Sequence, residues 1–294
     1  MPAPSIPPTG AVDLHAHSTC SDGRLTPAEL VAEARRAGLS GLALTDHDTL
    51  NGLAEAAAAS LQQGLLFVPG IELTCELEGA ETHLLGYGLD PTNRPLLDGL
   101  TEETAARRRR AESILERLSR MGIRLELGAL RADQGPIGRP HIAAAMVALG
   151  VCPDTRTAFE RYLSSRGAAF VPRRLRSLES AIALLHRSGA YAVLAHPGPK
   201  LAAEQLLRLK RAGLDGIEVA HPRHGEATQR ALRRLAAKLD LIATSGSDFH
   251  GLPGQQLGRP CAARELAEKL AAGCCDASAA DRETGDRSRT LDQH

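Results

Sequence analysis

The chain has 294 residues, which is long enough for a large α/β domain with an insertion and for a sizeable hydrophobic core. Lysine plus arginine and aspartate plus glutamate each total 35, so the charge balance argues against a nucleic-acid coat protein and a membrane-surface protein. Aromatic residues make up 2% of the chain and tryptophan is absent, which weakens any function built on base stacking.

The chain shows no targeting or membrane-spanning signal. Residues 1–8 have neither a basic start nor an apolar run, and no apolar segment approaches the ~20 residues that cross a bilayer. The sequence therefore predicts a cytoplasmic protein. The six cysteines form no Cys-x-x-Cys pair, so we expect free thiols. The polar residues 276–294 are expected to be a disordered tail.

The first third of the chain alternates apolar strands with helices. An apolar lead over residues 12–14 predicts the first strand, and Thr26-Pro27-Ala28-Glu29 is a capping box that opens a helix ending at Gly38. The next predicted elements are a strand at 42–45, a helix at 53–61, and strands at 66–72 and 82–87.

Residues 90–167 break this rhythm and are predicted to be a helical insertion. Thr101 is expected to cap a long helix, and Pro140 is expected to begin a second helix that stops near Gly150. The long helix contains four consecutive arginines, 107–110. Such a run usually forms a solvated helix face, so we do not interpret it as a nucleic-acid patch.

The alternating pattern returns after residue 177. The predicted helices are 178–188, 203–212 and 226–238, each followed by a strand, at 192–195, 216–219 and 241–244. Helices that alternate with short apolar strands predict parallel strands joined by crossover helices. With about seven strands, a closed α/β barrel is favoured over an open doubly wound sheet.

Metal-binding side chains stand at the ends of the predicted strands. His15 and His17 follow the first strand, and residues two apart in an extended chain point to the same side. The other candidates at strand ends are His47, Glu72, His83, His196, Asp248 and His250, and Asp22 follows the first pair in a Ser/Gly turn. A single histidine at such a place is more often structural, but the carboxyl ends of barrel strands meet on one face. The repeated placement therefore predicts a metal centre.

The number and type of these groups indicate which ions they bind. Nine groups exceed the three protein ligands of a typical catalytic zinc, so we expect two or three divalent ions that share a carboxylate. Imidazole and carboxylate ligands without thiolate favour Mn, with Fe or Zn as alternatives, over Mg. Closely spaced ions activate water and bind phosphate oxygens, which predicts hydrolysis of a phosphoester.

The motifs occur in a set order along the chain. They are His15-x-His17, Ser21-Asp22-Gly23, Thr45-Asp46-His47-Asp48, Gly70-Ile71-Glu72, His83, Ala195-His196-Pro197-Gly198 and Gly246-Ser247-Asp248-Phe249-His250. This set, over 12–89 and 168–258, closely resembles the PHP (polymerase and histidinol phosphatase) superfamily of metal-dependent phosphoesterases. The resemblance implies a distorted (β/α)7 barrel over 12–89 and 168–262, with the helical insertion 90–167 capping the active site.

The resemblance also implies a role for each residue. One ion would take His15, His17, Glu72 and Asp248, a second would share Glu72 and add His83 and His196, and a third would take Asp22, His47 and His250. Glu72 and Asp248 would be central to catalysis. Asp46 and Asp48 would orient His47 or transfer a proton. Some relatives have histidine at the position of Asp22, where aspartate still offers an oxygen ligand.

Further motifs indicate a branch of the family. Ile137-Gly138-Arg139-Pro140-His141, Phe170-Val171-Pro172-Arg173 and Gly216-Ile217-Glu218-Val219-Ala220-His221-Pro222 resemble bacterial members that act on nucleoside 3′,5′-bisphosphates and trim short 5′-phosphorylated RNA. The resemblance implies that Arg139, Arg173 and His221 bind phosphate, and an arginine at a helix start stands beside its positive end.

The expected activity is removal of the 3′-phosphate, which leaves a 5′-monophosphate and inorganic phosphate. The expected partner is a small nucleotide or short RNA, with no duplex DNA, membrane or obligatory protein partner. A histidinol-phosphate phosphatase is the alternative enzyme, which the long insertion and the Gly-Arg-Pro-His motif disfavour. An inactive metal-binding PHP module is the alternative without catalysis, which the full set of ligands disfavours.

Overall fold

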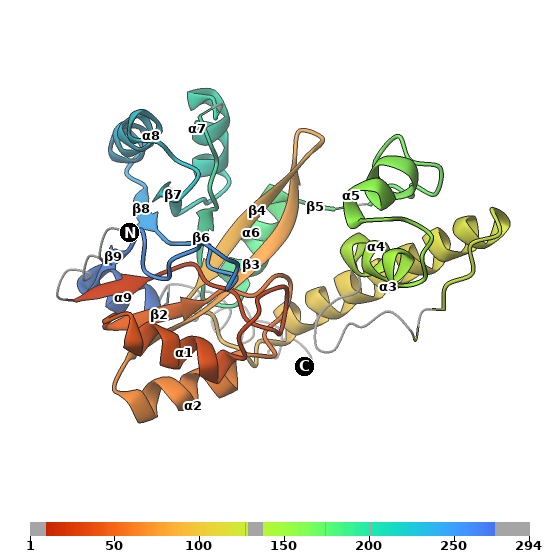
Figure 1. The fold of residues 1–294 in the computed structure, drawn as a ribbon. Helices are drawn as coiled ribbons and strands as arrows, with labels where there is room; N and C mark the ends of the chain where they lie inside the picture. The colour runs from red at the N-terminus through yellow and green to blue at the C-terminus, as the bar shows by residue number, and fades with distance from the viewer. Residues whose placement is uncertain (1–9, 127, 129–137, 174, 200, 274–294) are drawn as a thin grey trace, which may run out of the picture. The chain divides into compact units, whose positions relative to one another are not determined.

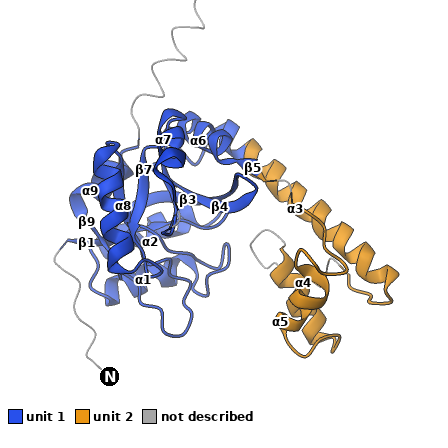
Figure 2. Ribbon diagram, turned by 90° about the horizontal axis from the view of Figure 1, so that it is seen from above, with its two compact units in different colours: residues 1–97, 176–294 blue, residues 98–175 orange. Residues whose placement is uncertain are grey.

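The computed structural model describes residues 10–126, 128, 138–173, 175–199 and 201–273. The chain forms two compact units, unit 1 (residues 1–97 and 176–294) and unit 2 (residues 98–175), shown in two colours in Figure 2. The predicted disordered tail lies outside the described residues. Within them, no helix is both long and apolar enough to cross a membrane. Cys20, Cys75, Cys152 and Cys261 form no disulfide bond among the described residues, which agrees with the prediction of reduced cysteines.

Unit 1 is built on a single mixed sheet with the strand order β8-β7-β6-β4-β3-β2-β1-β9 (Figure 1). The strands are β1 (Ala11–Asp13), β2 (Gly41–Leu44), β3 (Leu66–Leu77), β4 (Ala80–Tyr87), β5 (Arg176–Ser177), β6 (Tyr191–Leu194), β7 (Gly216–Ala220), β8 (Ile242–Ser245) and β9 (Ala262–Ala263). A bridge between Ala16 and Phe249 joins the chain just beyond β1 to the chain just beyond β8. The sheet therefore curls into a nearly closed barrel, which confirms the predicted fold class.

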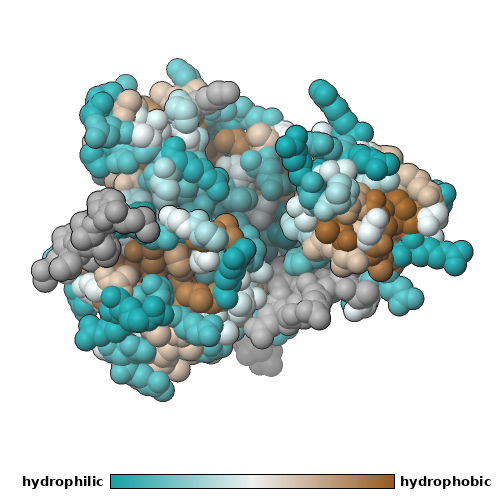
Figure 3. Space-filling model, in the orientation of Figure 1, coloured by the Kyte–Doolittle hydropathy of each residue, from teal (hydrophilic) through white to brown (hydrophobic). Residues whose placement is uncertain are grey.

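The helices of unit 1 pack on the outside of this sheet (Figure 1). They are α1 (Pro27–Arg36), α2 (Leu53–Gln63), α6 (Leu178–Arg187), α7 (Ala203–Arg211), α8 (Glu226–Lys238) and α9 (Arg264–Ala271). The predicted capping box of α1 is present, because Thr26 Oγ1 accepts from Glu29 N at 3.2 Å and Glu29 Oε2 accepts from Thr26 N at 2.8 Å. Hydrophilic side chains cover most of the face seen in Figure 3, while the barrel interior holds apolar residues such as Val12, Leu14 and Val193.

The prediction of parallel strands is wrong for β4. This strand runs antiparallel to both β3 and β6. The chain reverses direction at Glu78 and Gly79, which have φ values of 53° and 81°, and so short a turn leaves no room for a crossover helix. In this register His83 pairs with Thr74 in the middle of a ladder instead of following the carboxyl end of a strand.

Unit 2 is helical and has its own core. Its elements are α3 (Arg94–Arg120), which begins in unit 1, α4 (Arg139–Ala148), α5 (Thr155–Ala158) and the short π-helix η2 (Phe159–Leu163). The core includes Ile114, Leu118, Ile142 and Met146, all nearly or fully buried. The apolar faces of α3 and α4 thus stabilise this unit by burial against each other.

The predicted start of the long helix at Thr101 is wrong. Helix α3 begins at Arg94, and the side chain of Asn93 accepts a hydrogen bond from Leu96 N at 3.0 Å. Pro95 in the first turn needs no hydrogen-bond partner for its nitrogen, which suits a helix start. Thr101 therefore lies inside the helix.

Candidate active site

The residues predicted to bind metal converge at one end of the barrel. Their positions are His15 and His17 after β1, Asp22 in the following loop, His47 after β2, Glu72 on β3, His83 on β4, His196 after β6, and Asp248 and His250 after β8. The side chains of His15, His17 and Glu72 are 0% exposed, whereas that of Asp22 is 56% exposed. The site thus has a buried floor and an open rim.

Glu72 stands at the centre of this arrangement. Its two carboxylate oxygens face different imidazoles. The Oε2 atom is 3.2–3.3 Å from ring nitrogens of His15, His17 and His47. The Oε1 atom is 3.0 Å from His83 Nδ1 and 3.1 Å from His196 Nε2. A carboxylate shared in this way is suited to bridge two cations.

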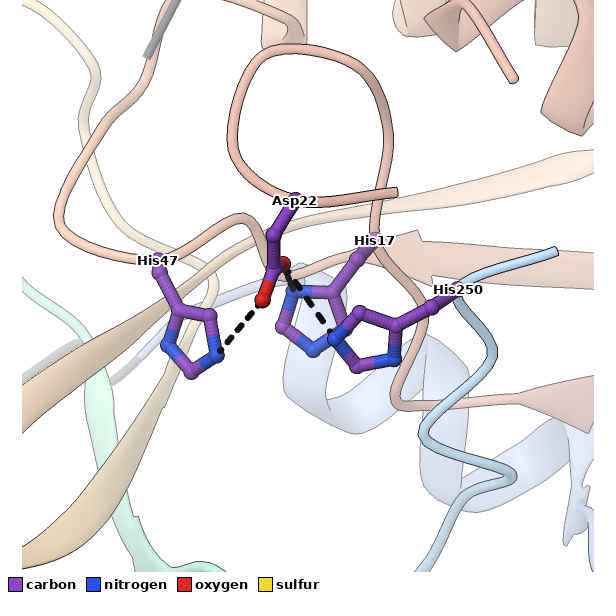
Figure 4. Close-up of side chains that lie close together, drawn as sticks. All are labelled: His17, Asp22, His47 and His250. Atoms are coloured by element: carbon purple, nitrogen blue, oxygen red, sulfur yellow. Dashed lines mark ion pairs between the residues drawn. The ribbon is translucent and has the colours of Figure 1, made fainter. Parts of the chain in front are cut away.

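A second group of donors lies at the rim, where Asp22 faces three imidazoles (Figure 4). The Asp22 carboxylate is 3.2 Å from His250 Nε2, 3.7 Å from His17 Nδ1 and 3.9 Å from His47 Nε2. These are the residues predicted for the third ion, joined by His17. Because the two ring nitrogens of His17 face Glu72 and Asp22 separately, His17 lies between the two groups.

The unpaired polar atoms of the site show that its residues fit divalent cations. His15 Nε2, both ring nitrogens of His17, His47 Nδ1, His83 Nδ1 and Glu72 Oε2 are buried and make no hydrogen bond with the described residues. Each such atom costs about 1–3 kcal/mol if nothing satisfies it, so a cluster of them calls for a ligand. His15, His17, Glu72 and Asp248 offer donor atoms that all lie within 4.8 Å of one another, as do His17, Asp22, His47 and His250.

The predicted set for the second ion is arranged somewhat differently. Glu72 and His83 form a compact donor group with His47, while His196 faces the same oxygen of Glu72, Oε1, as His83 does. His47 can therefore serve either group. The sharing of ligands between neighbouring groups is typical of multinuclear centres.

The electrostatics of the floor follow from burial and from the charge of the carboxylates. Burial lowers the pKa of His17, but Asp248 and Glu72 outweigh this and raise it to about 10. Burial also dominates at His47, whose pKa falls to about 4. Although burial raises the pKa of Glu72, the surrounding histidines, His47 and His15 first, hold it well below its usual range. Glu72 is therefore ionised at neutral pH, and a cation that binds His17 must displace its proton.

Glu218 on β7 positions two of the histidines. His15 Nδ1 donates to Glu218 Oε1 at 3.0 Å, so Nε2, which lies 3.2 Å from Glu72 Oε2, is the ring nitrogen that can bind a cation. The other oxygen, Oε2, accepts from His196 N at 2.8 Å. Glu218 was not among the predicted site residues, although a charged residue in an otherwise apolar strand is itself a signal of a role.

His221 holds Asp248 in place. Because His221 Nδ1 accepts a hydrogen bond from Arg223 N at 3.1 Å, its Nε2 carries the hydrogen and donates to Asp248 Oδ2 at 3.3 Å. The other oxygen, Oδ1, faces His17 Nε2 at 3.3 Å and His15 Nε2 at 3.5 Å. His221 thus lies behind a candidate ligand, and its predicted contact with phosphate stays a prediction.

Asp46 and Asp48 tie loops together at the same end of the barrel. Asp46 accepts from Ser18 N at 2.8 Å, from Ser18 Oγ at 2.6 Å and from Ser21 Oγ at 2.5 Å, so it fixes the loop that carries Asp22. Asp48 accepts from Thr74 N and Thr74 Oγ1, each at 2.8 Å. The predicted part of Asp46 in proton transfer stays a prediction.

The backbone of the site adopts unusual conformations. His196 and Asp248 have φ values of 26° and 51°, a backbone region that residues other than glycine rarely adopt. Gly246 shows how tightly β8 approaches β1, because a Cβ atom there would lie 2.2 Å from His15 Cβ. A glycine is needed at this position to keep His15 in place.

In unit 2, Arg139 and Arg173 line one pocket, and their predicted contact with phosphate stays a prediction. Arg107 and Arg110 of α3 line it too, together with Ala111, Ile114, Gly138 and Ile142. Arg139 Nη1 donates to Leu163 O at 3.2 Å, and its guanidinium lies 5.7 Å from the Phe159 ring centroid. No acidic side chain is among these lining residues, although Glu103 lies 3.9 Å from Arg173. The pocket therefore has a lining rich in guanidinium groups.

The four-arginine run is not simply a solvated helix face. Arg108 and Arg109 are exposed, whereas Arg107 and Arg110 are partly buried at the pocket. Arg110 Nε donates to Val171 O at 2.8 Å. Residues three apart share a helix face, so Arg107 and Arg110 lie together on the face with the pocket, and Arg108 and Arg109 are left on the exposed side.

A barrel whose strand ends present histidines around a buried glutamate defines a class of metal-dependent hydrolases. Comparisons with known proteins are consistent with this class. A PHP domain model matches residues 13–130. The chain is 38% identical to a 3′,5′-nucleoside bisphosphate phosphatase of Chromobacterium violaceum, over 83% of this chain and 88% of that protein.

Two further comparisons agree. A 5′-3′ exoribonuclease of Haemophilus influenzae is 34% identical over 89% of this chain and 95% of its own length. The crystal structure of a protein from Bifidobacterium adolescentis, proposed as a metal-dependent phosphoesterase, superposes with a TM-score of 0.79 at 35% identity, covering 90% of this chain and 96% of that one. The chain belongs to the PHP family, and it is a metal-dependent phosphoesterase.

Proposed function

We propose that this phosphoesterase removes the 3′-phosphate of nucleoside 3′,5′-bisphosphates and that the same site trims short 5′-phosphorylated RNA. The observation that carries the proposal is the Glu72 centre of unit 1, whose clustered donors can hold the ions that bind and hydrolyse a phosphoester. The relatives named for these two activities support the same substrate class.

In the proposed reaction, a water oxygen attacks the phosphorus and the bond to the ribose 3′-oxygen breaks. The 3′-oxygen leaves as a hydroxyl group, and the products are the nucleoside 5′-monophosphate and phosphate. Two or three divalent ions, which we propose to be Mn²⁺, supply a nucleophile at neutral pH and offset the charge on the phosphate.

The residues of the barrel hold these ions and set their positions. The donors are His15, His17, Asp22, His47, Glu72, His83, His196, Asp248 and His250. Glu218 fixes the tautomer of His15, and His221 fixes the carboxylate of Asp248. A rigid centre of this kind stabilises the transition state because its charges are arranged before the substrate arrives.

The arginine pocket is proposed to bind the phosphate that is not hydrolysed. Guanidinium groups bind phosphate through several charge-assisted hydrogen bonds, and the pocket is lined by Arg107, Arg110, Arg139 and Arg173. Histidinol phosphate has one phosphate and a cationic amine, which these arginines would repel. The pocket therefore favours a bisphosphate or a 5′-phosphorylated RNA over the alternative enzyme substrate.

The proposal is tested by measuring product release from a panel of substrates with Mn²⁺, Fe²⁺ or Zn²⁺ added. The panel contains a nucleoside 3′,5′-bisphosphate, the matching 3′- and 5′-monophosphates, histidinol phosphate and a 5′-phosphorylated oligoribonucleotide. We expect the highest kcat/KM for the bisphosphate and release of 5′-monophosphates from the RNA. A preference for histidinol phosphate or for monophosphates would contradict the proposed substrate.

A further inference from the structure

A second pocket opens in the barrel beside the metal centre. It has a volume of about 310 Å³, and its wall includes His221, Arg223, Asp248, Gln256 and Arg259. These residues come from the segments that follow β7 and β8, so the pocket is at the same end of the barrel as the centre. Asp248 belongs to both, because it lines the pocket and lies near His15 and His17.

Two arginines give this pocket a positive wall. Arg223 Nη2 lies 3.3 Å from Asp248 Oδ2, while its side chain is 70% exposed and therefore accessible to a ligand. Arg259 is partly buried and forms no ion pair with the described carboxylates. Asp248 is the sole acidic residue among the described lining residues, and its Oδ1 faces the metal centre.

The loop that carries Arg259 is held to the centre by Gln255. Its Oε1 atom accepts from His250 N at 2.8 Å and from Leu252 N at 3.1 Å. Its Nε2 atom donates to Asp248 O at 3.3 Å. The position of this pocket wall is therefore tied to two of the candidate ligands.

The lining indicates the kind of group that fits. No aromatic ring other than imidazole is among the lining residues, so a nucleobase has no stacking partner there, whereas arginines suit a sugar-phosphate. The volume is at the lower end of the ~300–1,000 Å³ range of small-molecule sites, which suits a nucleotide-sized group better than a phosphate ion.

We propose that this pocket binds the downstream nucleotide of an RNA substrate, the one that keeps the hydrolysed phosphate. The inference rests on the proposed function. A phosphodiester at the centre has two ester substituents. One is the 5′-terminal nucleotide, which leaves when water attacks the phosphorus and the bond to its 3′-oxygen breaks. The other is the downstream nucleotide, which stays attached to the phosphorus through its 5′-oxygen. A nucleoside bisphosphate has no such downstream nucleotide. Arg223 and Arg259 bind the phosphate on the 3′ side of the downstream nucleotide.

The test compares a nucleoside 3′,5′-bisphosphate with a 5′-phosphorylated trinucleotide that begins with the same nucleoside. Arg259→Ala is expected to lower the ratio of kcat/KM for the trinucleotide to that for the bisphosphate by about tenfold or more, mainly through KM, because one charge-assisted contact is lost. Arg259→Lys, which keeps the charge, is expected to recover part of this ratio. Arg234→Ala, an exposed arginine on α8, removes the same charge and should leave the ratio at the wild-type value.

The outcomes separate the inference from the proposed function. An unchanged ratio in Arg259→Ala, with turnover of the bisphosphate showing that the variant is folded, would overturn the inference. An equal loss for both substrates would also overturn it and would assign the pocket to the 5′-phosphate. If the wild-type protein hydrolyses neither substrate, the proposed function itself fails, independently of Arg259.

Discussion

At the scale of single residues, the site depends on what each donor atom faces. Glu72 presents one oxygen to three imidazoles and the other to two. The second nitrogen of His15 and the second oxygen of Asp248 are occupied by Glu218 and His221. Such partners fix tautomers and ring orientations, so a metal centre depends on residues that never touch the ion.

The variant Glu218→Gln tests this positioning role. The glutamine amide can present either its oxygen or its NH2 group to His15, so the tautomer of His15 is no longer fixed. We expect the affinity for Mn²⁺ to fall about 10- to 100-fold, with phosphate release largely restored at saturating metal. Metal titration followed by phosphate release measures both. Glu226→Gln, an exposed change on α8, is the control. An unchanged affinity in Glu218→Gln would show that Glu218 does not position His15.

At the scale of elements, the barrel brings together residues that are far apart in the sequence. The ligands at strand ends could be predicted because parallel strands of a barrel meet at their carboxyl ends. His83 was predicted to be a ligand, and it does lie beside Glu72, although the predicted direction of its strand was wrong because the turn at Glu78 and Gly79 was not recognised as a hairpin. Glu218 was overlooked because an apolar strand pattern does not show which neighbours a single charged residue will meet.

In helix α3 of unit 2, too, one part of the arrangement could be predicted from the sequence and another part could not. The run 107–110 could be placed on a helix from the sequence, but the side that is buried depends on the packing of α4 and on the segment around Val171. Those tertiary contacts decide that Arg107 and Arg110 line the pocket while Arg108 and Arg109 are exposed. Periodicity alone predicts two faces without saying which one is functional.

This division of the run gives a prediction with an internal control. Arg107→Ala is expected to raise KM for the nucleoside bisphosphate by about tenfold or more, because one guanidinium of the anion pocket is lost. Arg109→Ala removes the same charge from the exposed face of the same helix and should leave KM near the wild-type value. Steady-state kinetics with the bisphosphate and with a simple aryl phosphate distinguish the two. Equal effects of both variants would mean that the pocket does not bind the substrate.

At the scale of the whole molecule, the two units carry different parts of the proposed chemistry. Unit 1 contains the candidate metal-binding residues and the pocket beside Asp248, and unit 2 contains the arginine pocket. The family membership accounts for the barrel and for hydrolysis of phosphoesters. The sequence predicted a helical insertion over 90–167 because the alternation of strands and helices stops and later resumes, whereas unit 2 covers residues 98–175. That the insertion caps the active site stays a prediction.

The central claim is that Glu72 organises a metal centre that hydrolyses phosphoesters. The most direct test is the variant Glu72→Gln, with Glu76→Gln on the same strand as control, in a combined measurement of bound metal and phosphate release from the bisphosphate. We predict at least two ions per chain in the wild type and the control, with full activity. In Glu72→Gln we predict fewer bound ions and a loss of kcat/KM of ~10³-fold or more, with the fold retained by circular dichroism. Wild-type metal content and turnover in Glu72→Gln would contradict the account.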